Sequence, residues 1–237
     1  MRETVVKVKN KITRFNSPVN RGVFSLSFCK DTWDSVWEKQ RVRKSTLHSL
    51  IYFLREHYFS ATFARFARKR IKGLILEVGC GTAQCSLKIR VKGIDIIGAD
   101  FSASALQLAK KYSTQNQLIK FVVTDAFNLP FAENTFDAVW SVGLLEHFDK
   151  PSLALVEMRR VVKTKGKVIA IVPYRAGLLG ILNYGYKKLG KEWIWEDENP
   201  MGVDDLYRFF EQAHLRNIRI KRMYDTFLMF LGATGEK

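Results

Sequence analysis

Two carboxylates and two glycines stand at a spacing that suits the binding of a nucleoside. Residues 74–78 form an apolar run that includes Glu77 and leads directly into Gly79 and Gly81. Glycine lacks a Cβ and reaches backbone angles that other residues avoid, so a glycine-rich turn after a strand lets a ligand approach the main chain. The next apolar run ends at Asp100, where a carboxylate can accept hydrogen bonds from ribose hydroxyls. The pattern therefore predicts a site for a nucleoside-type cofactor.

The spacing of the glycines excludes two common nucleotide-binding loops. The dinucleotide fingerprint Gly-x-Gly-x-x-Gly needs a third glycine where this chain has Gln84. The P-loop sequence Gly-x-x-x-x-Gly-Lys-Ser/Thr does not occur in the chain. The expected cofactor is therefore not a nicotinamide dinucleotide, and no phosphate-binding P-loop is present to hold a nucleoside triphosphate.

From about residue 73 to residue 225 the chain resembles the class I S-adenosylmethionine-dependent methyltransferases, in the group that includes the ubiquinone and menaquinone biosynthesis enzymes. The resemblance implies S-adenosyl-L-methionine as the cofactor and methyl transfer as the reaction. One departure is Ala83, which stands where the family often has a glycine, and we expect the turn to tolerate it. The resemblance rests on five ordered blocks, which are residues 76–82, 98–111, 121–131, 135–148 and 158–173.

The resemblance implies that the first glycine-rich loop passes under the cofactor. Glu77 would meet the amino acid end of the cofactor, and Gly79, Cys80 and Gly81 would form the loop beneath it. We interpret Cys80 and Cys85 as small side chains packed around this loop, because the neighbouring sequence lacks the further ligands that a metal site needs. No bound metal is expected.

The same resemblance assigns the nucleoside to the ends of the next strands. Asp100 would bind the two ribose hydroxyls, and Phe101 would lie against the adenine. Asp125 would accept a hydrogen bond from the adenine amino group, because an ionised carboxylate is only an acceptor. The backbone amide of Ala126 would face a ring nitrogen. Ser141 belongs to the central strand, and the loop after that strand would border the transferred methyl group.

His147 is the candidate general base, because it follows the fourth strand and histidine titrates near neutral pH. A base is needed only when the acceptor is a hydroxyl or an acidic carbon, since a sulfonium methyl group is already activated. Glu146 and Tyr174 are weaker candidates for the base. The alternative for His147 is a structural role, in which a hydrogen bond orients its loop.

The succession of apolar runs predicts an α/β fold. We expect a Rossmann-like, doubly wound sheet of seven mostly parallel strands, with the last strand antiparallel, preceded by a helical extension. Residues 1–72 would form the basic N-terminal helical extension, and residues 73–237 the methyltransferase domain, with an acceptor-side lid insertion at 174–200. The last elements are expected to be a helix over 203–215 and strands over 217–224 and 227–231.

Apolar residues recur at helical spacing in the extension. One stripe consists of Phe59, Phe63 and Phe66, and the spacing predicts a helix that packs on the sheet or covers the cofactor. We interpret Trp33 and Trp37 as anchors of another helix, with contact to substrate as the alternative. A second stripe comprises Leu47, Leu50, Ile51, Leu54 and Tyr58.

Positive charge is concentrated in the same extension. The chain carries a net charge of +16, and residues 1–72, with 17 basic and 5 acidic residues, contribute +12 of it. Such a segment can attract nucleic acid, anionic lipid or a pyrophosphorylated substrate, or it can be a solvated face that aids solubility, which we favour. Three cysteines without a close pair, and the lack of a signal peptide or long apolar run, favour a cytoplasmic location.

The acceptor is expected to be a small or lipid-like molecule. The lid insertion carries Trp193 and Trp195, and loops beyond the strand ends of a doubly wound sheet face the ligand. Residues 141–144 lack the Pro-Pro-Tyr or Pro-Pro-Phe motif of DNA amino-methylating enzymes, and no cysteine stands near that loop to act as the nucleophile for carbon-5 methylation of pyrimidines. Two alternatives stay open: an RNA-modifying methyltransferase, and a non-catalytic S-adenosylmethionine-binding protein that engages RNA or a partner through its basic arm.

Overall fold

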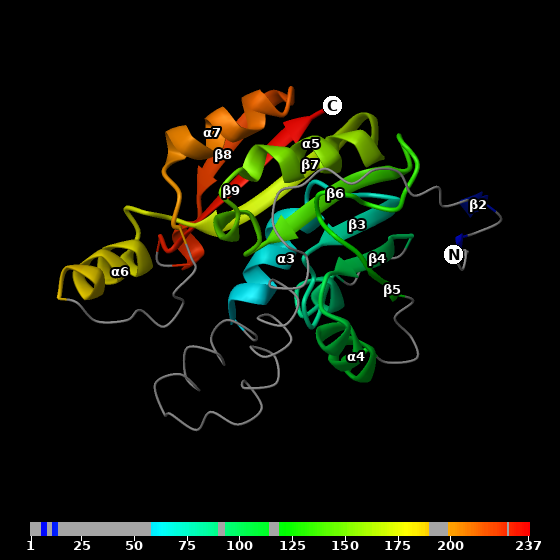
Figure 1. Ribbon diagram of the computed structural model, residues 1–237, viewed down its shortest axis with the longest axis horizontal. Coiled ribbons are helices and arrows are strands. Elements are labelled where there is room, and N and C mark those ends of the chain that lie inside the picture. Colours follow the sequence, from blue (N-terminus) through cyan, green and yellow to red (C-terminus); the bar gives the residue numbers. More distant parts are fainter. Residues whose placement is uncertain are drawn as a thin grey trace.

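A seven-stranded sheet forms the centre of the fold (Figure 1). The computed structural model describes residues 6–8, 11–13, 58–89, 93–113, 119–189, 199–226 and 228–237. Within these residues the strand order of the large sheet is β5-β4-β3-β6-β7-β9-β8. This order confirms the prediction of a Rossmann-like, doubly wound sheet.

Most strands of the sheet run parallel, and the last one is antiparallel to both of its neighbours. The parallel strands are β3 (Leu74–Val78), β4 (Asp95–Asp100), β5 (Ile119–Val123), β6 (Phe136–Val142) and β7 (Val162–Pro173), and β9 (Phe230–Glu236) lies between β7 and β8 (Arg216–Arg222). The strand order reverses at β3, which lies between β4 and β6. Because ligands of open α/β sheets bind beyond the strand ends at such a reversal, the site is expected at this edge.

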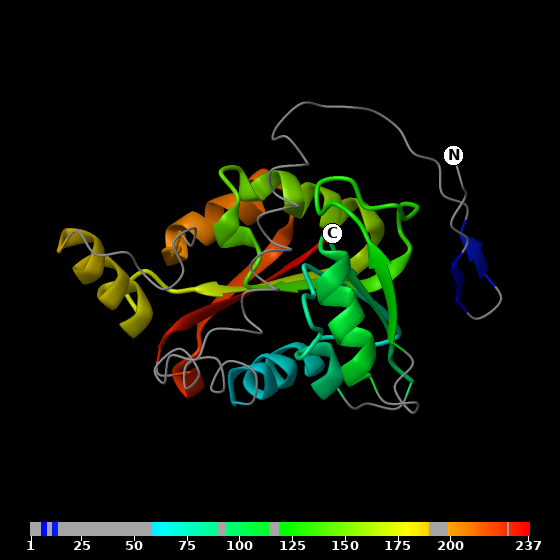
Figure 2. The ribbon, with the colours of Figure 1, turned by 60° about the horizontal axis from the view of Figure 1, so that its bottom comes forward.

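Helices cover both faces of the sheet, because side chains of successive strand residues point to opposite faces. In β3, Ile75 packs with the residues of α3, whereas Leu76 packs with those of α5 and α7. Figure 2 shows α3 below the sheet and α5 and α7 above it. One face carries α3 (Ser60–Arg68) and α4 (Ala103–Tyr112), and the other carries α5 (Pro151–Val161) and α7 (Val203–Gln212). The described residues also include three short 3-10 helices, which are η2 (Ser86–Lys88), η3 (Leu145–His147) and η4 (Tyr224–Thr226).

The aromatic stripe at the start of α3 is buried as predicted. Phe59, Phe63 and Phe66 all pack into the core on one face of the sheet. The ring of Phe63 lies edge-on to that of Phe230, with 4.8 Å between the ring centroids. A Cβ at Gly232 in β9 would come within 2.6 Å of the Phe66 ring. Glycine at this position therefore allows α3 to lie close to the sheet.

The end of the chain differs from the sequence prediction. The last strand is Phe230–Glu236 rather than residues 227–231. Its glycines look like turn residues in the sequence, but Gly235 is a point of close packing, where a Cβ would lie 3.0 Å from the Phe210 ring. The preceding helix ends at Gln212 instead of residue 215, because the chain turns through His214 with φ 55°.

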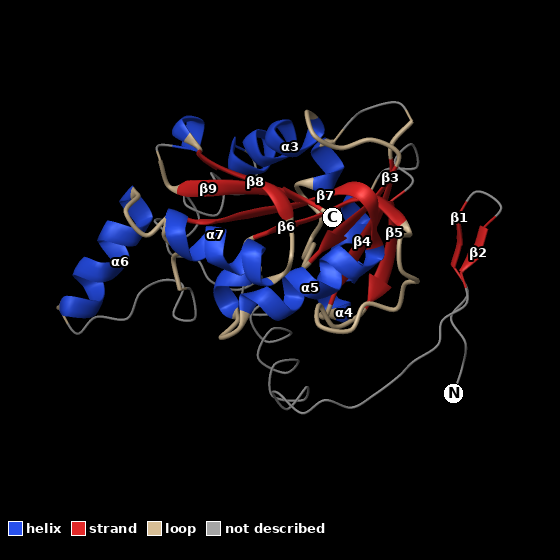
Figure 3. Cartoon of the chain, turned by 90° about the horizontal axis from the view of Figure 1, so that it is seen from above, coloured by secondary structure: helices blue, strands red, loops and turns tan. Residues whose placement is uncertain are grey.

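The extension also contains elements that the sequence prediction missed. β1 (Val6–Val8) and β2 (Lys11–Thr13) pair antiparallel as a separate two-stranded sheet (Figure 3), although only helices were predicted here. Their β-branched valine, isoleucine and threonine residues favour strands over helices. Tyr58, which the helical spacing assigned to an apolar stripe, is exposed. That part of the prediction is wrong.

Several predicted features lie outside the described residues. They are Trp33 and Trp37, the apolar stripe at residues 47–54, and Trp193 and Trp195 of the lid insertion. The helix of the insertion that the structure does describe is α6 (Leu178–Lys188). Across the described ranges, no helix combines the length and apolar character that a membrane span requires.

Candidate functional site

The loop after β3 is built on a left-handed backbone. The φ angles of Gly79, Gly81 and Ala83 are 69°, 52° and 58°. Glycine adopts this conformation freely, whereas an L-residue pays about 1 to 2 kcal/mol for it. Ala83 therefore keeps a glycine-type conformation, with its methyl group fully buried. The N–H groups of Gly79 and Cys80 both donate to the Ala99 carbonyl, at 2.8 and 3.0 Å, which ties the loop to β4.

Asp100 fixes the other side of this loop. Its Oδ2 accepts a 2.7 Å hydrogen bond from the N–H of Gly81, and its Oδ1 accepts one of 2.9 Å from the N–H of Ser102. The side chain is only partly buried, and each carboxylate oxygen can accept a second hydrogen bond. Phe101, the next residue, is also partly buried. The arrangement is compatible with the predicted ribose contact.

Glu77 is buried at the end of β3, where the Ser86 hydroxyl donates a hydrogen bond to its Oε2. Burial raises the pKa of Glu77 to about 8, because a charged carboxylate loses its hydration there. The Ser86 hydrogen bond lowers the pKa and the nearby charge of Asp100 raises it, but burial is the largest effect. Glu77 thus sits at a place where a cationic group would stabilise its ionised form.

The Cys80 side chain packs in a small core cluster with Ala83, Leu87 and Leu106. Its thiol is buried, and a Cβ on Gly98 of β4 would lie 3.0 Å from the sulfur. Burial raises the pKa of this thiol, and the charges of Asp100 and Glu77 add to the rise, so the group stays protonated. The structure supports the interpretation of Cys80 as a packing residue. The described residues include no cluster of histidine, cysteine, aspartate and glutamate suited to a metal.

The turn after β5 begins at Asp125. The Asp125 Oδ1 accepts a 2.9 Å hydrogen bond from the N–H of Phe127, so that the partly buried Ala126 lies inside a short turn. Just before the turn, the Thr124 N–H donates to the carbonyl of Asp100 at 2.9 Å. The Asp125 turn therefore starts directly beside the end of β4.

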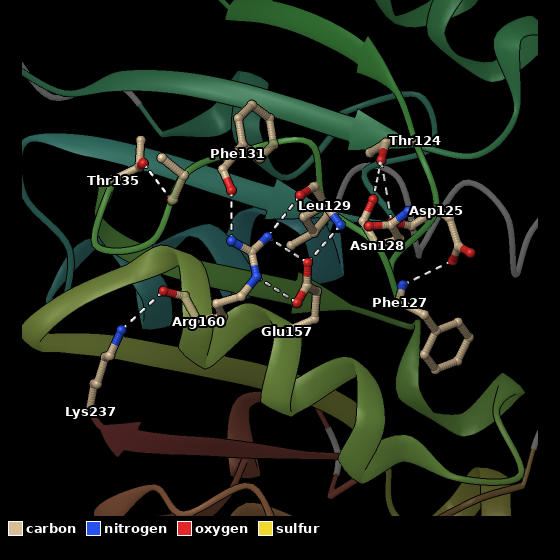
Figure 4. A network of polar contacts seen from close by, with 11 residues as sticks. Thr124, Asp125, Phe127, Asn128, Leu129, Phe131, Thr135, Glu157, Arg160 and Lys237 are labelled. Atoms are coloured by element: carbon tan, nitrogen blue, oxygen red, sulfur yellow. Dashed lines mark hydrogen bonds and ion pairs between the residues drawn. The ribbon is translucent and has the colours of Figure 1, made fainter. Parts of the chain in front are cut away.

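An ion pair on α5 holds the far end of the same turn (Figure 4). The guanidinium of Arg160 donates to the carbonyls of Leu129 and Phe131, at 2.9 and 2.8 Å. Glu157 accepts from the Leu129 N–H at 2.8 Å and from Arg160 itself at 2.6 Å. Two adjacent side chains of one helix thus satisfy three backbone groups of the loop that carries Asp125.

The loop after β6 meets the glycine loop. A Cβ on Gly79 would lie 2.7 Å from Leu144 Cδ1, so the two loops touch only because residue 79 has no side chain. Ser141, near the end of β6, is buried, and its Oγ has no hydrogen-bond partner within the described residues. In η3, Glu146 is fully buried and His147 is partly buried.

The insertion after β7 leaves and returns at the same point. The Arg175 N–H donates to the Met201 carbonyl at 2.9 Å, and Tyr174 pairs with Met201 as an isolated parallel bridge. The Asn199 N–H donates to the Glu146 carbonyl at 3.1 Å. The end of the insertion therefore lies against the loop after β6.

The structure gathers the predicted residues at one edge of the sheet. Glu77, Asp100 and Ser141 lie at or near the ends of adjacent parallel strands, and Asp125 follows the end of β5. Sequence reasoning missed Ser86, Glu157 and Arg160. The spacing of Glu157 and Arg160 indicates an ion pair on one helix face, but nothing in the sequence shows that this pair reaches the Asp125 loop.

Comparisons with known proteins agree with this geometry. Residues 76–170 match a family described as a methyltransferase domain. A demethylmenaquinone methyltransferase from Bacillus cereus is 29% identical over 209 residues, which are 78% of this chain and 88% of that protein. A methyltransferase solved in complex with the Haloferax volcanii Trm112 methyltransferase activator has a TM-score of 0.66 at 20% identity, covering 86% of this chain and 96% of that chain.

A second solved structure, a SAM-dependent methyltransferase from Thermotoga maritima, has a TM-score of 0.63 at 20% identity over 81% of this chain and 96% of that chain. These two structures are evidence for the fold. The matched domain, the strand order and the related sequences together define this chain as a class I S-adenosylmethionine-dependent methyltransferase. Its cofactor is S-adenosylmethionine.

Proposed function

We propose that the protein transfers the methyl group of S-adenosylmethionine to a small, lipid-like acceptor. The observation that carries the acceptor class is the similarity, over 78% of the chain, to a protein named for demethylmenaquinone, an apolar quinone. The insertion after β7 supports it, because its end contacts the loop after β6 and its helix α6 bears large exposed apolar side chains.

In this proposal the cofactor is held by the residues at the strand ends. Glu77 receives the cationic amino group, and the loop of Gly79, Cys80 and Gly81 lies beneath the amino acid portion. Asp100 accepts hydrogen bonds from the ribose hydroxyls. The buried carboxyl of Glu77 and the double acceptor capacity of Asp100 support these roles.

The remaining contacts belong to the adenine and to the methyl group. We assign Phe101, Asp125 and Ala126 to the adenine and Ser141 to the end of the site that borders the methyl group. The Ser141 hydroxyl supports this fit, because a buried hydroxyl that has no partner within the described residues gains a hydrogen bond when a polar ligand binds beside it.

The bound cofactor supplies an activated sulfonium methyl, so the chain mainly has to align the acceptor and exclude water. The contact of Leu144 with Gly79 and the return of the insertion at Asn199 bring the acceptor-side loops against the cofactor loop. His147 is proposed as the base that removes a proton from an acidic acceptor. His147→Ala should then lower kcat and remove a near-neutral limb from the pH profile; an unchanged profile would assign His147 a structural role.

The function is tested with methyl-labelled S-adenosylmethionine and three acceptor pools: a membrane-lipid extract, a polar metabolite extract and total RNA. Label in a lipid or small molecule, absent with an Asp100→Ala variant, is the expected result. A short-chain demethylated quinone then serves as a defined acceptor. Label confined to RNA would make the protein an RNA-modifying enzyme. Cofactor binding without transfer to any pool would indicate a non-catalytic S-adenosylmethionine-binding protein.

A further inference from the structure

Helix α6 carries an apolar stripe that faces away from the protein. Leu178, Ile181 and Leu182 of α6 are 51%, 60% and 43% exposed, and Leu189, the residue directly after the helix, is 72% exposed. At 100° per residue these positions share one side of a helix, and the Leu189 N–H still donates to the Gly185 carbonyl in the helical pattern. In both Figure 1 and Figure 2, α6 extends away from the sheet.

Basic side chains lie on α6 and on the edge strand β8. The sequence of α6 contains no acidic residue, and Lys188 near its end is exposed. The edge strand β8 exposes Arg219, Lys221 and Arg222 and also lacks acidic residues. The guanidinium of Arg222 lies 5.8 Å from the centroid of the Tyr174 ring, four residues before α6 begins. Positive charge therefore stands beside the base of the helix.

We propose that α6 is an interfacial helix that seats the protein on a membrane surface containing anionic lipid. Its leucines and isoleucine enter the boundary between headgroups and acyl chains, and the lysine and arginine side chains contact the phosphates. A second copy of the chain is a poorer occupant, because it would bring another net charge of +16 against the same basic surface. The docking goes beyond the proposed function and holds whatever the acceptor is.

The position of α6 would place a docked membrane close to the cofactor site. The helix follows β7, whose carboxyl end lies at the same edge of the sheet as those of β3, β4 and β6. A bilayer that contacts α6 is therefore brought to the edge where the cofactor loops lie. An acceptor dissolved in that bilayer would reach the site by a short path.

Vesicle flotation tests the proposal with the full chain. Wild-type protein should bind mixed vesicles of phosphatidylcholine and phosphatidylglycerol at least about tenfold more tightly than vesicles of phosphatidylcholine alone. Added salt should weaken the binding to the mixed vesicles. The triple variant Leu178→Ser, Ile181→Ser, Leu189→Ser should bind the mixed vesicles about tenfold more weakly or worse. Replacing Lys188 and Lys221 by glutamine should reduce the preference for the anionic vesicles.

A matched control uses Leu153 and Val156 on α5, which are 46% and 43% exposed. The pair Leu153→Ser, Val156→Ser should float like wild type. Equal cofactor affinity in all variants would show that they are folded. The proposal is overturned if wild type does not bind anionic vesicles or if the triple variant binds them as well as wild type. It is also overturned if light scattering shows a dimer that the triple variant loses. Methyl transfer to a soluble acceptor without vesicles tests the function separately.

Discussion

The backbone N–H of Gly81 donates a 2.7 Å hydrogen bond to Oδ2 of Asp100, which joins the glycine loop after β3 to the end of β4. The same carboxylate accepts the Ser102 N–H at the start of α4. Asp100 therefore holds three parts of the chain together. The same side chain thus shapes the glycine loop and is proposed to bind the ribose.

Asp100→Ala should weaken S-adenosylmethionine binding by at least about tenfold, because hydrogen bonds to a charged acceptor are lost and the loop loses its anchor. Asp95→Asn, at the opposite end of β4, is the control and should bind normally. Isothermal titration calorimetry measures both. Unchanged affinity in the alanine variant would show that the end of β4 does not contact the cofactor.

Glu77 should make stability depend on pH. Its pKa is raised from 4.5 to about 8 in the fold, so the folded state holds a proton that the unfolded chain releases between these values. The stability from this proton is fully present below about pH 4.5 and is lost as pH rises toward 8, by up to about 1.4 kcal/mol per unit. Thermal unfolding of wild type between pH 5 and 8 should show this fall, and Glu77→Gln should lack it. If the stability of wild type and of Glu77→Gln changed with pH in the same way, the raised pKa of Glu77 would be refuted.

Ser141→Ala should separate ligand binding from stability. Removing a buried hydroxyl that has no partner within the described residues should change the free energy of unfolding by no more than about 0.5 kcal/mol, yet weaken cofactor binding several-fold if the hydroxyl contacts the ligand. Ser102→Ala is the contrasting control. Its Oγ caps α4 by accepting the Ala105 N–H at 3.1 Å, so it should cost about 1 kcal/mol. Unaltered affinity in Ser141→Ala would remove Ser141 from the site.

Gly79→Ala should destabilise the fold by about 2 kcal/mol or more, because the residue has φ 69° and its new Cβ would press on Leu144. Leu144→Ala should relieve the steric part but leave the backbone cost. In a double-mutant cycle by urea unfolding, Gly79→Ala should therefore cost less in the Leu144→Ala background. Strict additivity would show that the two loops do not press on each other.

Arg160→Met should reveal the clamp on the Asp125 loop. It leaves two backbone carbonyls and Glu157 without their partner, so we expect a loss of about 2 to 4 kcal/mol in unfolding free energy and weaker cofactor binding. Arg159→Met, one residue earlier, removes a hydrogen bond to the exposed His214 carbonyl and should cost less than about 1 kcal/mol. If both variants bind the cofactor like wild type, the clamp serves stability alone.

The parts of the fold that the sequence predicts are those specified locally. The positions of Glu77, Asp100 and the left-handed glycines can be predicted, because an apolar run, an acid and a turn follow one another within a few residues. The aromatic stripe of α3 is predicted because Phe59, Phe63 and Phe66 recur at helical spacing. Glu77 and Asp100 also mark the edge of the sheet at which the carboxyl ends of the parallel strands lie.

The missed features depend on contacts between distant segments. Arg160 reaches the carbonyl of Phe131, 29 residues earlier in the chain, and no local pattern specifies that contact. Gly232 and Gly235 of β9 lie against aromatic rings of α3 and α7. The sequence alone does not show these contacts, so the two glycines look like turn residues. Sequence periodicity predicts which face of a helix or strand a residue occupies, but it does not predict which distant residue packs against that face.

The insertion after β7 closes on itself at Tyr174 and Met201, and the Met201 N–H donates to the carbonyl of Pro173 at 3.0 Å. The described ends of the insertion therefore meet at one place beside the end of β7. A graft that replaces the residues between Tyr174 and Met201 should therefore leave the strand register and the glycine loop intact, and it would test whether the insertion selects the acceptor.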